Sequence, residues 1–110
     1  MSVASPIGRM RRRVTLEAPV ETADDVGGVV RAFVPVAALW ADITPLGGEA
    51  RFVADQAQER LTHKVRLRWR DGVSAAMRFR LGARLLAIRD VSDASETRRF
   101  LVCHCLEVKP

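Results

Sequence analysis

The stretch that decides the fold is Thr62-His63-Lys64-Val65-Arg66-Leu67-Arg68-Trp69, in which apolar and basic residues alternate. Successive side chains of a strand point to opposite faces, so Val65, Leu67 and Trp69 share one face. The opposite face then carries Lys64, Arg66, Arg68 and Arg70. This period of two predicts a strand with one face in a hydrophobic core and the other face outside it.

The same alternation recurs on both sides of this stretch. After a turn signal at Asp71-Gly72, the apolar residues of 77–81 alternate with Arg78 and Arg80. We expect this strand to neighbour the first one, with the basic residues of both on one face. Pro19 is expected to end the first strand of the chain, and Pro35 predicts an edge or a bulge. Further strands are expected at 13–17, 29–36, 38–44, 85–91 and 100–108.

The period changes from Glu49 onward. Phe52, Val53, Gln56, Ala57 and Arg60 fall at helical spacing, which predicts one short amphipathic helix. About six or seven strands, separated by frequent turn signals, indicate a small antiparallel sheet structure. The predicted fold is therefore mainly β, a small antiparallel barrel or sandwich with one short flanking α-helix.

Length and composition fit one folded unit. The chain has 110 residues, of which 48% are hydrophobic and 28% charged. We expect a flexible tail at 1–8 and a single domain at 9–110.

No apolar run is long enough for a membrane span, and residues 1–14 lack the apolar region of a secretory signal. Cys103 and Cys105 lie two apart on one strand, so free thiols in a reducing compartment are expected.

The charge balance is basic. The net charge is +5, and of the 18 basic residues only Lys64 and Lys109 are not arginine. Like charges opposite each other on neighbouring strands repel, so the basic face predicts a negative partner: DNA phosphate, an acidic protein surface or a second copy. The alternative is a solvated face on which Arg side chains cover apolar surface. Trp69 and Phe79 point away from the arginines of their strands, so no platform for stacked bases is predicted.

A second basic run, residues 9–13, permits two interpretations. It is either an arm that binds nucleic acid or the end of a strand, and that strand end lies in solvent or docks onto a partner.

Residues that could carry a reaction are few. His63, Cys103 and Cys105 would supply three zinc ligands, but no pair of cysteines has zinc-finger spacing, and buried free cysteines explain the pattern better. Neither histidine lies in an acid–base motif, and no glycine-rich phosphate loop is present. We therefore expect no catalytic residues, no metal and no cofactor. Asp24 and Asp25 could bind a cation, although hairpin-turn chemistry also accounts for them.

Several segments follow one another in a recognisable order and spacing: Ile7–Leu16, Asp25–Gly28 with Phe33, Leu39–Glu49, Thr62–Arg68 and Arg98–Leu101. Together they resemble the small head–tail joining, or head-closure, proteins of tailed phages. Leu39–Glu49 is similar to the Trp-Ala-x-Ile-x-Pro signature of that family. The resemblance spans about residues 7–108, and the Arg-rich, Ala-rich composition is similar to copies in alphaproteobacterial prophages and gene transfer agents.

This resemblance implies a small β-barrel, copies of which form a ring in the neck of a virion made in the bacterial host cytoplasm. The ring would lie between the portal-bound adaptor ring and the tail terminator or tail-completion ring. It would continue the channel for double-stranded DNA and, in stopper-type members, help to retain that DNA. The segment Thr44–Arg60 can face the lumen in such rings, so we expect Gly47, Gly48, Glu49 and Arg51 to approach the channel. No membrane partner is expected.

A ring of identical copies needs two complementary lateral faces. We expect contacts with a neighbouring subunit or adjoining ring at the basic residues and two turn acids: Lys64, Arg66, Arg68, Arg70, Arg78, Arg80, Asp24 and Asp25. Two alternatives remain open. One is a basic β-barrel that binds nucleic acid on its own, with a steep salt dependence. The other is a small metal enzyme built on His63, Cys103 and Cys105, which stoichiometric zinc would indicate.

Overall fold

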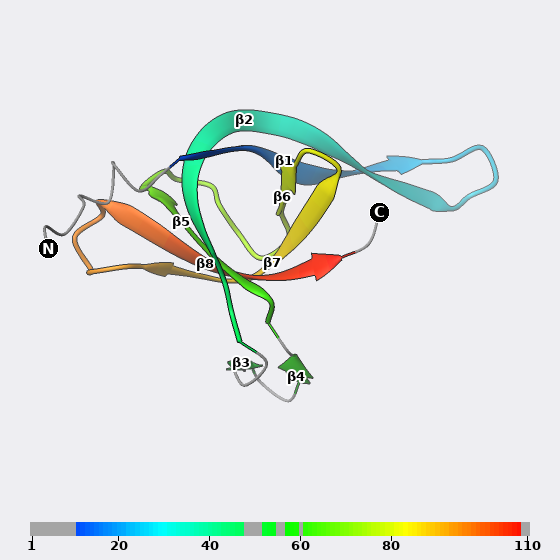
Figure 1. Ribbon diagram of the computed structural model, residues 1–110. Coiled ribbons are helices and arrows are strands. Elements are labelled where there is room, and N and C mark those ends of the chain that lie inside the picture. Colours follow the sequence, from blue (N-terminus) through cyan, green and yellow to red (C-terminus); the bar gives the residue numbers. More distant parts are fainter. Residues whose placement is uncertain (1–10, 48–51, 55–56, 60, 109–110) are drawn as a thin grey trace, which may run out of the picture.

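The computed structural model describes residues 11–47, 52–54, 57–59 and 61–108 (Figure 1). Six of its strands form a closed antiparallel barrel in the order β1-β2-β5-β8-β7-β6. Their bounds are β1 Arg12–Ala23, β2 Val29–Pro45, β5 His63–Arg68, β6 Arg78–Leu81, β7 Arg84–Asp93 and β8 Phe100–Val108. The prediction of a small antiparallel β-barrel is confirmed.

Alternate residues of these strands fill the barrel. The period-two pattern places Val65 and Leu67 inside, and both are fully buried. Phe79 is buried with them and has an exposed fraction of 0%. The barrel closes where β1 meets β6, through the pairs Thr15↔Arg80, Leu16↔Phe79 and Glu17↔Arg78. Closure satisfies strand edges that would otherwise be open, and it encloses one continuous core.

β1 and β2 continue beyond the barrel as a two-stranded arm, defined here as residues 18–34 and coloured blue to cyan in Figure 1. The prediction that Pro19 ends the first strand is wrong, because Pro19 pairs with Phe33 and β1 runs on to Ala23. Outside the barrel β1 has a single described neighbour, so the missing N–H of a proline is tolerated at its open edge. The segments 29–36 and 38–44 are likewise one strand.

The bulge expected near Pro35 is present. The register of β1 and β2 shifts between Leu16 and Glu17, which pair with Ala37 and Pro35 and leave Val36 without a partner. An extra residue on one strand bends that strand and increases its twist. The arm therefore leaves the barrel directly at this bulge.

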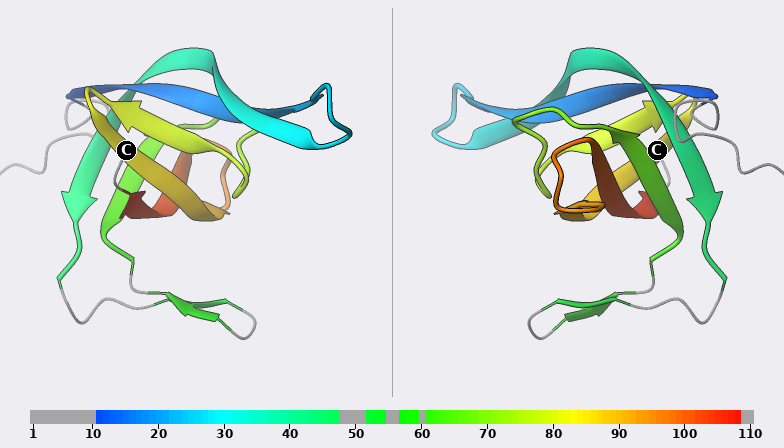
Figure 2. Two further views of the ribbon diagram at one scale, coloured as in Figure 1. Left: turned by 90° about the vertical axis from the view of Figure 1, so that its right-hand side faces the viewer. Right: turned by 90° about the vertical axis from the view of Figure 1, so that its left-hand side faces the viewer.

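The predicted helix after Glu49 is wrong. The described parts of that segment are the short strands β3 (Phe52–Ala54) and β4 (Ala57–Glu59), which pair with each other. Both lie apart from the barrel (Figure 2). A short helix is stable mainly through packing of its apolar stripe on another element, and among the described residues β3 and β4 pair only with each other. Gly48, Glu49, Arg51 and the tail at 1–8 lie outside the described residues.

The expectation that 64–70 and 77–81 form neighbouring strands is also wrong. β5 lies between β2 and β8, whereas β6 lies between β1 and β7, so two strands separate them in either direction around the barrel. The turn at Asp71-Gly72 exists, with Gly72 at φ +86°. However, the Trp69 N–H donates to the Arg99 carbonyl at 2.9 Å. This hydrogen bond holds the chain after β5 against the residues just before β8. The chain then crosses to the opposite side of the barrel, where β6 begins.

Within the described ranges, no helix is long and apolar enough to cross a membrane.

Candidate functional site

The arginines of β6 meet a carboxylate of their own chain. Arg78 Nε donates to Glu17 Oε1 at 2.7 Å, and Arg80 Nε donates to Glu17 Oε2 at 2.9 Å. The Glu17 side chain is only 8% exposed. Burial by itself raises the pKa of Glu17, but the hydrogen bonds and charges of the two arginines outweigh it and leave that pKa lowered. A negative partner for these two predicted interface residues therefore lies inside the molecule.

Aromatic rings do lie beside the basic residues, contrary to the sequence-based expectation. The Arg66 guanidinium lies 4.8 Å from the ring centroid of Phe100, and that of Arg78 lies 3.9 Å from the Phe33 centroid. Phe100 belongs to β8, which pairs with β5, and Phe33 belongs to the part of β2 that pairs with β1. Alternation within one strand cannot show either contact. A guanidinium over an aromatic face contributes about 0.5–1 kcal/mol where both are partly exposed. Both rings are already covered, so this geometry favours arginines that shield apolar surface.

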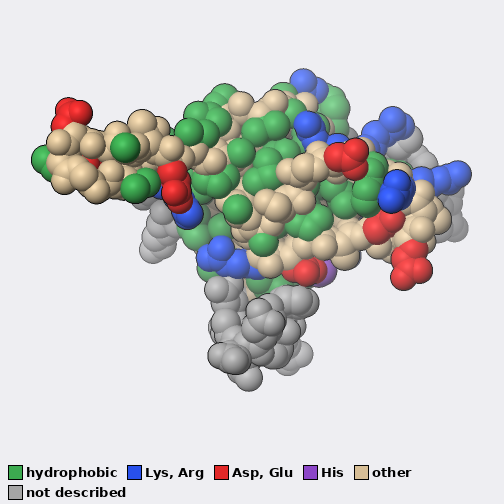
Figure 3. Space-filling model, turned by 180° about the vertical axis from the view of Figure 1, so that it is seen from behind, with side chains coloured by type: hydrophobic (Ala, Val, Ile, Leu, Met, Phe, Trp, Pro, Cys, Tyr) green, Lys and Arg blue, Asp and Glu red, His purple; other side chains and the backbone are tan. Residues whose placement is uncertain are grey.

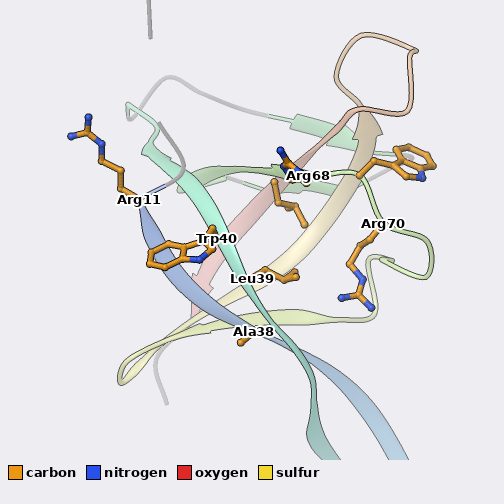
Figure 4. A pocket seen from close by; sticks show the side chains of 8 residues that line it. Arg11, Ala38, Leu39, Trp40, Arg68 and Arg70 are labelled. Carbon is orange, nitrogen blue, oxygen red and sulfur yellow. The ribbon is translucent and has the colours of Figure 1, made fainter. Parts of the chain in front are cut away.

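A groove of about 760 Å³ opens between β2 and the chain that follows β5 (Figure 4). β2 pairs with β5 only from Ala41↔Leu67 to Pro45↔His63, and beyond Ala41 it remains paired with β1 alone. The groove occupies the gap that this divergence leaves. Its lining combines five apolar residues with three arginines, which are called its rim here: Ala38, Leu39, Trp40, Leu67 and Trp69, with Arg11, Arg68 and Arg70.

Two of the predicted interface residues thus belong to one surface. Arg68 is exposed at the groove, and Arg70 is partly buried there. Arg70 Nε has no hydrogen-bond partner among the described residues, although the atom is buried. A buried donor without an acceptor is costly, so an acceptor brought by a partner would stabilise this position. Lys64 and Arg66 lie farther along β5, and Arg78 and Arg80 lie on the opposite wall.

The two turn acids lie at the tip of the arm. Asp24 Oδ1 accepts hydrogen bonds from the Val26 N–H at 2.9 Å and the Gly28 N–H at 2.7 Å. Gly27 has φ +84°, a conformation that other residues rarely adopt, so glycine is required at this turn. Asp24 therefore closes the hairpin, as turn chemistry predicts, while Asp25 beside it is exposed.

The three residues considered as zinc ligands do not point toward a common centre in the structure. Cys103 and Cys105 are buried in the barrel. His63 contacts the Thr62 hydroxyl through Nδ1 at 2.8 Å and Arg84 through Nε2 at 3.2 Å, and burial lowers the pKa of His63. No three potential ligands gather around one point in the described part of the chain. The geometry therefore gives no support to the metal-enzyme alternative.

Burial makes the two thiols poor nucleophiles. It raises the pKa of Cys103 from 9.0 to about 12 and raises that of Cys105 as well. At pH 8 this change alone reduces the thiolate fraction of Cys103 roughly a thousandfold. We expect a chromogenic thiol reagent to react with both cysteines only after unfolding in urea. Rapid reaction of either thiol in the folded protein would contradict their burial.

The fold and the groove together define a class of protein, a small β-barrel with surfaces suited to partners. The described residues form a small closed barrel with an exposed arm, a groove lined by apolar residues and arginines, and an ion cluster in which Glu17 holds Arg78 and Arg80. An exposed arm and an apolar groove of this kind are typical of contact with a partner. A family model supports this class: the model of phage head completion proteins matches residues 5–108, and the chain belongs to that family. Membership gives the protein a structural role in the phage head and places it in the virion, as the sequence resemblance predicted.

Two solved structures share the fold. A chain from the virion of a native gene transfer agent particle is 24% identical with a TM-score of 0.68, over 93% of this chain and 98% of that chain. Protein SF1141 from Shigella flexneri 2a, solved in solution, is 24% identical with a TM-score of 0.69, over 94% of this chain and 96% of that chain. No curated protein matches the sequence.

Sequence reasoning missed Glu17 and the groove. Glu17 stands out in sequence only as the acid of a short alternating strand, and its partner Arg78 is 61 residues away. The groove depends on where β2 parts from β5, which no local pattern reveals. A signal for the arm was present in the valines that flank the Asp24–Gly28 turn.

Proposed function

We propose that this chain is a subunit of a head–tail connector ring of the stopper or head-closure type. The ring lies between the portal-bound adaptor ring and the tail, and double-stranded DNA passes through its lumen. The protein works without catalysis and without a cofactor. The observation that carries the proposal, beside family membership, is the arm: a long two-stranded projection with an uncovered apolar face.

Cross-strand pairing places Val20 with Ala32, Thr22 with Val30 and Ala18 with Val34, so these side chains share one face of the arm. The exposed fractions of Val20, Val30 and Val34 are 43%, 53% and 41%. Figure 3 shows hydrophobic side chains along the arm and over the adjoining barrel surface. A two-stranded ribbon is only marginally stable in water, and an exposed apolar face of this kind is typical of contact with a partner.

Subunits that line the lumen of such a ring do not need to recognise a DNA sequence. DNA of any sequence must pass, so contacts should be directed to phosphate or be purely electrostatic. The strands β3 and β4, which lie apart from the barrel on the segment that begins after Gly47, are the part we assign to the channel (Figure 2). The residues that we expect to approach the channel all precede β3 in sequence: Gly47, Gly48, Glu49 and Arg51.

The function is tested by deleting the gene in the strain that produces the particles. We expect heads that package DNA and then lose it, with few or no tails, and recovery when the wild-type gene is restored. Cryo-electron microscopy of recovered particles should show the barrel in the neck. Normal tailed particles without the protein would overturn the proposal.

The nucleic-acid alternative is separated by DNA binding of the isolated chain. We expect weak binding to duplex DNA, because Glu17 neutralises part of the charge of Arg78 and Arg80, and Arg66 covers Phe100. Fluorescence anisotropy across a salt series measures this. Submicromolar binding that falls steeply with salt would instead favour the stand-alone nucleic-acid-binding protein.

A further inference from the structure

We propose that the arm of one copy seats its apolar face in the groove of the next copy, so that the arm and the groove are the two lateral faces of the ring. This inference rests on the proposed connector function and names the parts that interlock. A contact of this kind is heterologous, since different surfaces of identical chains meet, and repetition around an axis closes a ring.

The two surfaces match in polarity. The inner lining of the groove is apolar, with Leu67 buried at its base and Leu39 and Trp69 half-buried beside it. The arm offers a row of small β-branched side chains, of which Val20, Val30 and Val34 are exposed. A groove of about 760 Å³ has room for several such side chains. Seating removes apolar area from water on both copies, which is the main favourable contribution in protein association.

The two surfaces also have opposite charge. Residues 18–34 contain Glu21, Asp24, Asp25 and Arg31, which gives the arm a net charge of −2. The rim of the groove carries Arg11, Arg68 and Arg70. Asp25 is exposed at the tip of the arm, and the buried Arg70 Nε lacks an acceptor among the described residues. Complementary charges of this kind fix the register of a contact and exclude wrong partners.

The groove and the arm also both have strand edges whose main-chain groups are unpaired among the described strands. Residues 38–40 of β2 line the groove, and on the side of β5 they pair with no described strand. An unpaired edge accepts another strand readily through main-chain hydrogen bonds. A seated arm brings open edges of its own, because beyond Glu17 its two strands pair only with each other in the described part of the chain.

The arm cannot fill the groove of its own chain. Residues 29 to 38 separate the tip from the groove and lie extended in β2, which is roughly 30 Å at 3.3 Å per residue. Pairing with β1 along the whole arm holds it in this extended form. The residues before Arg11 are a poorer occupant by charge: residues 1–10 hold Arg9 and no acidic residue, so they would meet Arg68 and Arg70 with like charge.

Chemical cross-linking in purified particles tests the contact. Val26, 89% exposed at the tip, and Ala38 in the groove are both replaced by cysteine, and a short bismaleimide is added. The buried native thiols should not react. We expect a ladder of dimers, trimers and higher oligomers from the doubly substituted protein. The single variants Val26→Cys and Ala38→Cys are the controls and should give no ladder.

Two matched substitutions test the apolar face. Val30→Asp places a charge on the face that we expect to be seated, whereas Val29→Asp places the same charge on the opposite face. Both valines are more than half exposed, at 53% and 65%, so the isolated chain should tolerate either change equally. We expect Val30→Asp to lower the yield of tailed particles at least tenfold and Val29→Asp to leave it near wild type. Equal yields would overturn the proposal.

A charge exchange tests the rim. Asp25→Arg and Arg70→Glu should each lower particle yield, and the double variant should restore it at least in part. Asp25 is chosen because Asp24 closes the turn. If the double variant assembles no better than the weaker single variant, the pairing is wrong.

The remaining outcomes separate the two proposals. Protein found in the neck of particles, but without the ladder, overturns the arm-in-groove contact and leaves the connector function standing. Absence of the protein from the neck overturns the connector function itself. A ladder that stops at dimers shows a reciprocal exchange between two copies, and increased reactivity of Ala38→Cys after deletion of residues 1–10 shows that the tail fills the groove. Either result would overturn the proposal.

Discussion

Replacing Glu17 with alanine is expected to lower the free energy of unfolding by about 3 kcal/mol, near the lower limit for breaking a buried ion pair. The carboxylate is 8% exposed and holds two arginines, one on each oxygen. Its removal leaves the guanidinium of Arg78, which is 20% exposed, without its acceptor, while Arg80 at 41% can turn toward solvent. Urea denaturation followed by tryptophan fluorescence measures the loss, and a change below about 1 kcal/mol would contradict this account.

Glu17→Gln is the matched control, because it keeps the shape and one acceptor oxygen but removes the charge. Its loss should be smaller than that of the alanine variant. The pKa of Glu17 is lowered from 4.5 in the folded protein, so the unfolded state binds the proton more tightly. The stabilisation is therefore fully present above pH 4.5 and is lost as the pH falls through the lowered value. The glutamine variant should lack this part of the acid destabilisation.

Replacing Phe79 with alanine should cost about 4 kcal/mol, a large part of the total stability of a domain this size. Phe79 is the largest of the fully buried side chains and pairs with Leu16 across the seam that closes the barrel. Removal of the ring leaves a cavity that the surrounding strands cannot fill without opening this seam. The same denaturation experiment measures the effect.

Phe33→Ala is the matched control for Phe79→Ala, since it removes the same ring from a partly buried position outside the core. We expect a cost of about 1 kcal/mol, from the lost contact with Arg78 and a modest loss of apolar burial. If both alanine variants are equally stable, the packing described for the barrel is wrong.

Strands were predictable from sequence because period-two alternation is local. The last strand was expected at 100–108 and is observed at Phe100–Val108, and the basic strand was expected from Thr62 to Trp69 and is observed at His63–Arg68. The segment after Glu49 was not predictable in this way. Its apolar residues fit helical spacing as well as short strands, so the period alone cannot decide between the two.

Pairing order was beyond local patterns. A turn at Asp71-Gly72 suggests a hairpin, yet β6 pairs with β1, about sixty residues earlier in the chain. The same non-local pairing brings Glu17 to the arginines and opens the groove where β2 leaves β5. The basic residues that alternation predicted on one face are therefore divided between two walls of the barrel. Only Arg68 and Arg70 remain together beside a surface suited to a partner.

The position of β8 within the sheet has a consequence for synthesis of the chain. β8 lies between β5 and β7, and its pairs run from Arg68↔Phe100 to Leu85↔Val108. The barrel therefore cannot close until residues 100–108 have left the ribosome, whereas the β1–β2 arm can form early from adjacent sequence. Folding that depends on such distant pairing is slow and leaves strand edges exposed meanwhile. A chain truncated before Phe100 lacks this strand, so only chains translated through Val108 can form a closed core.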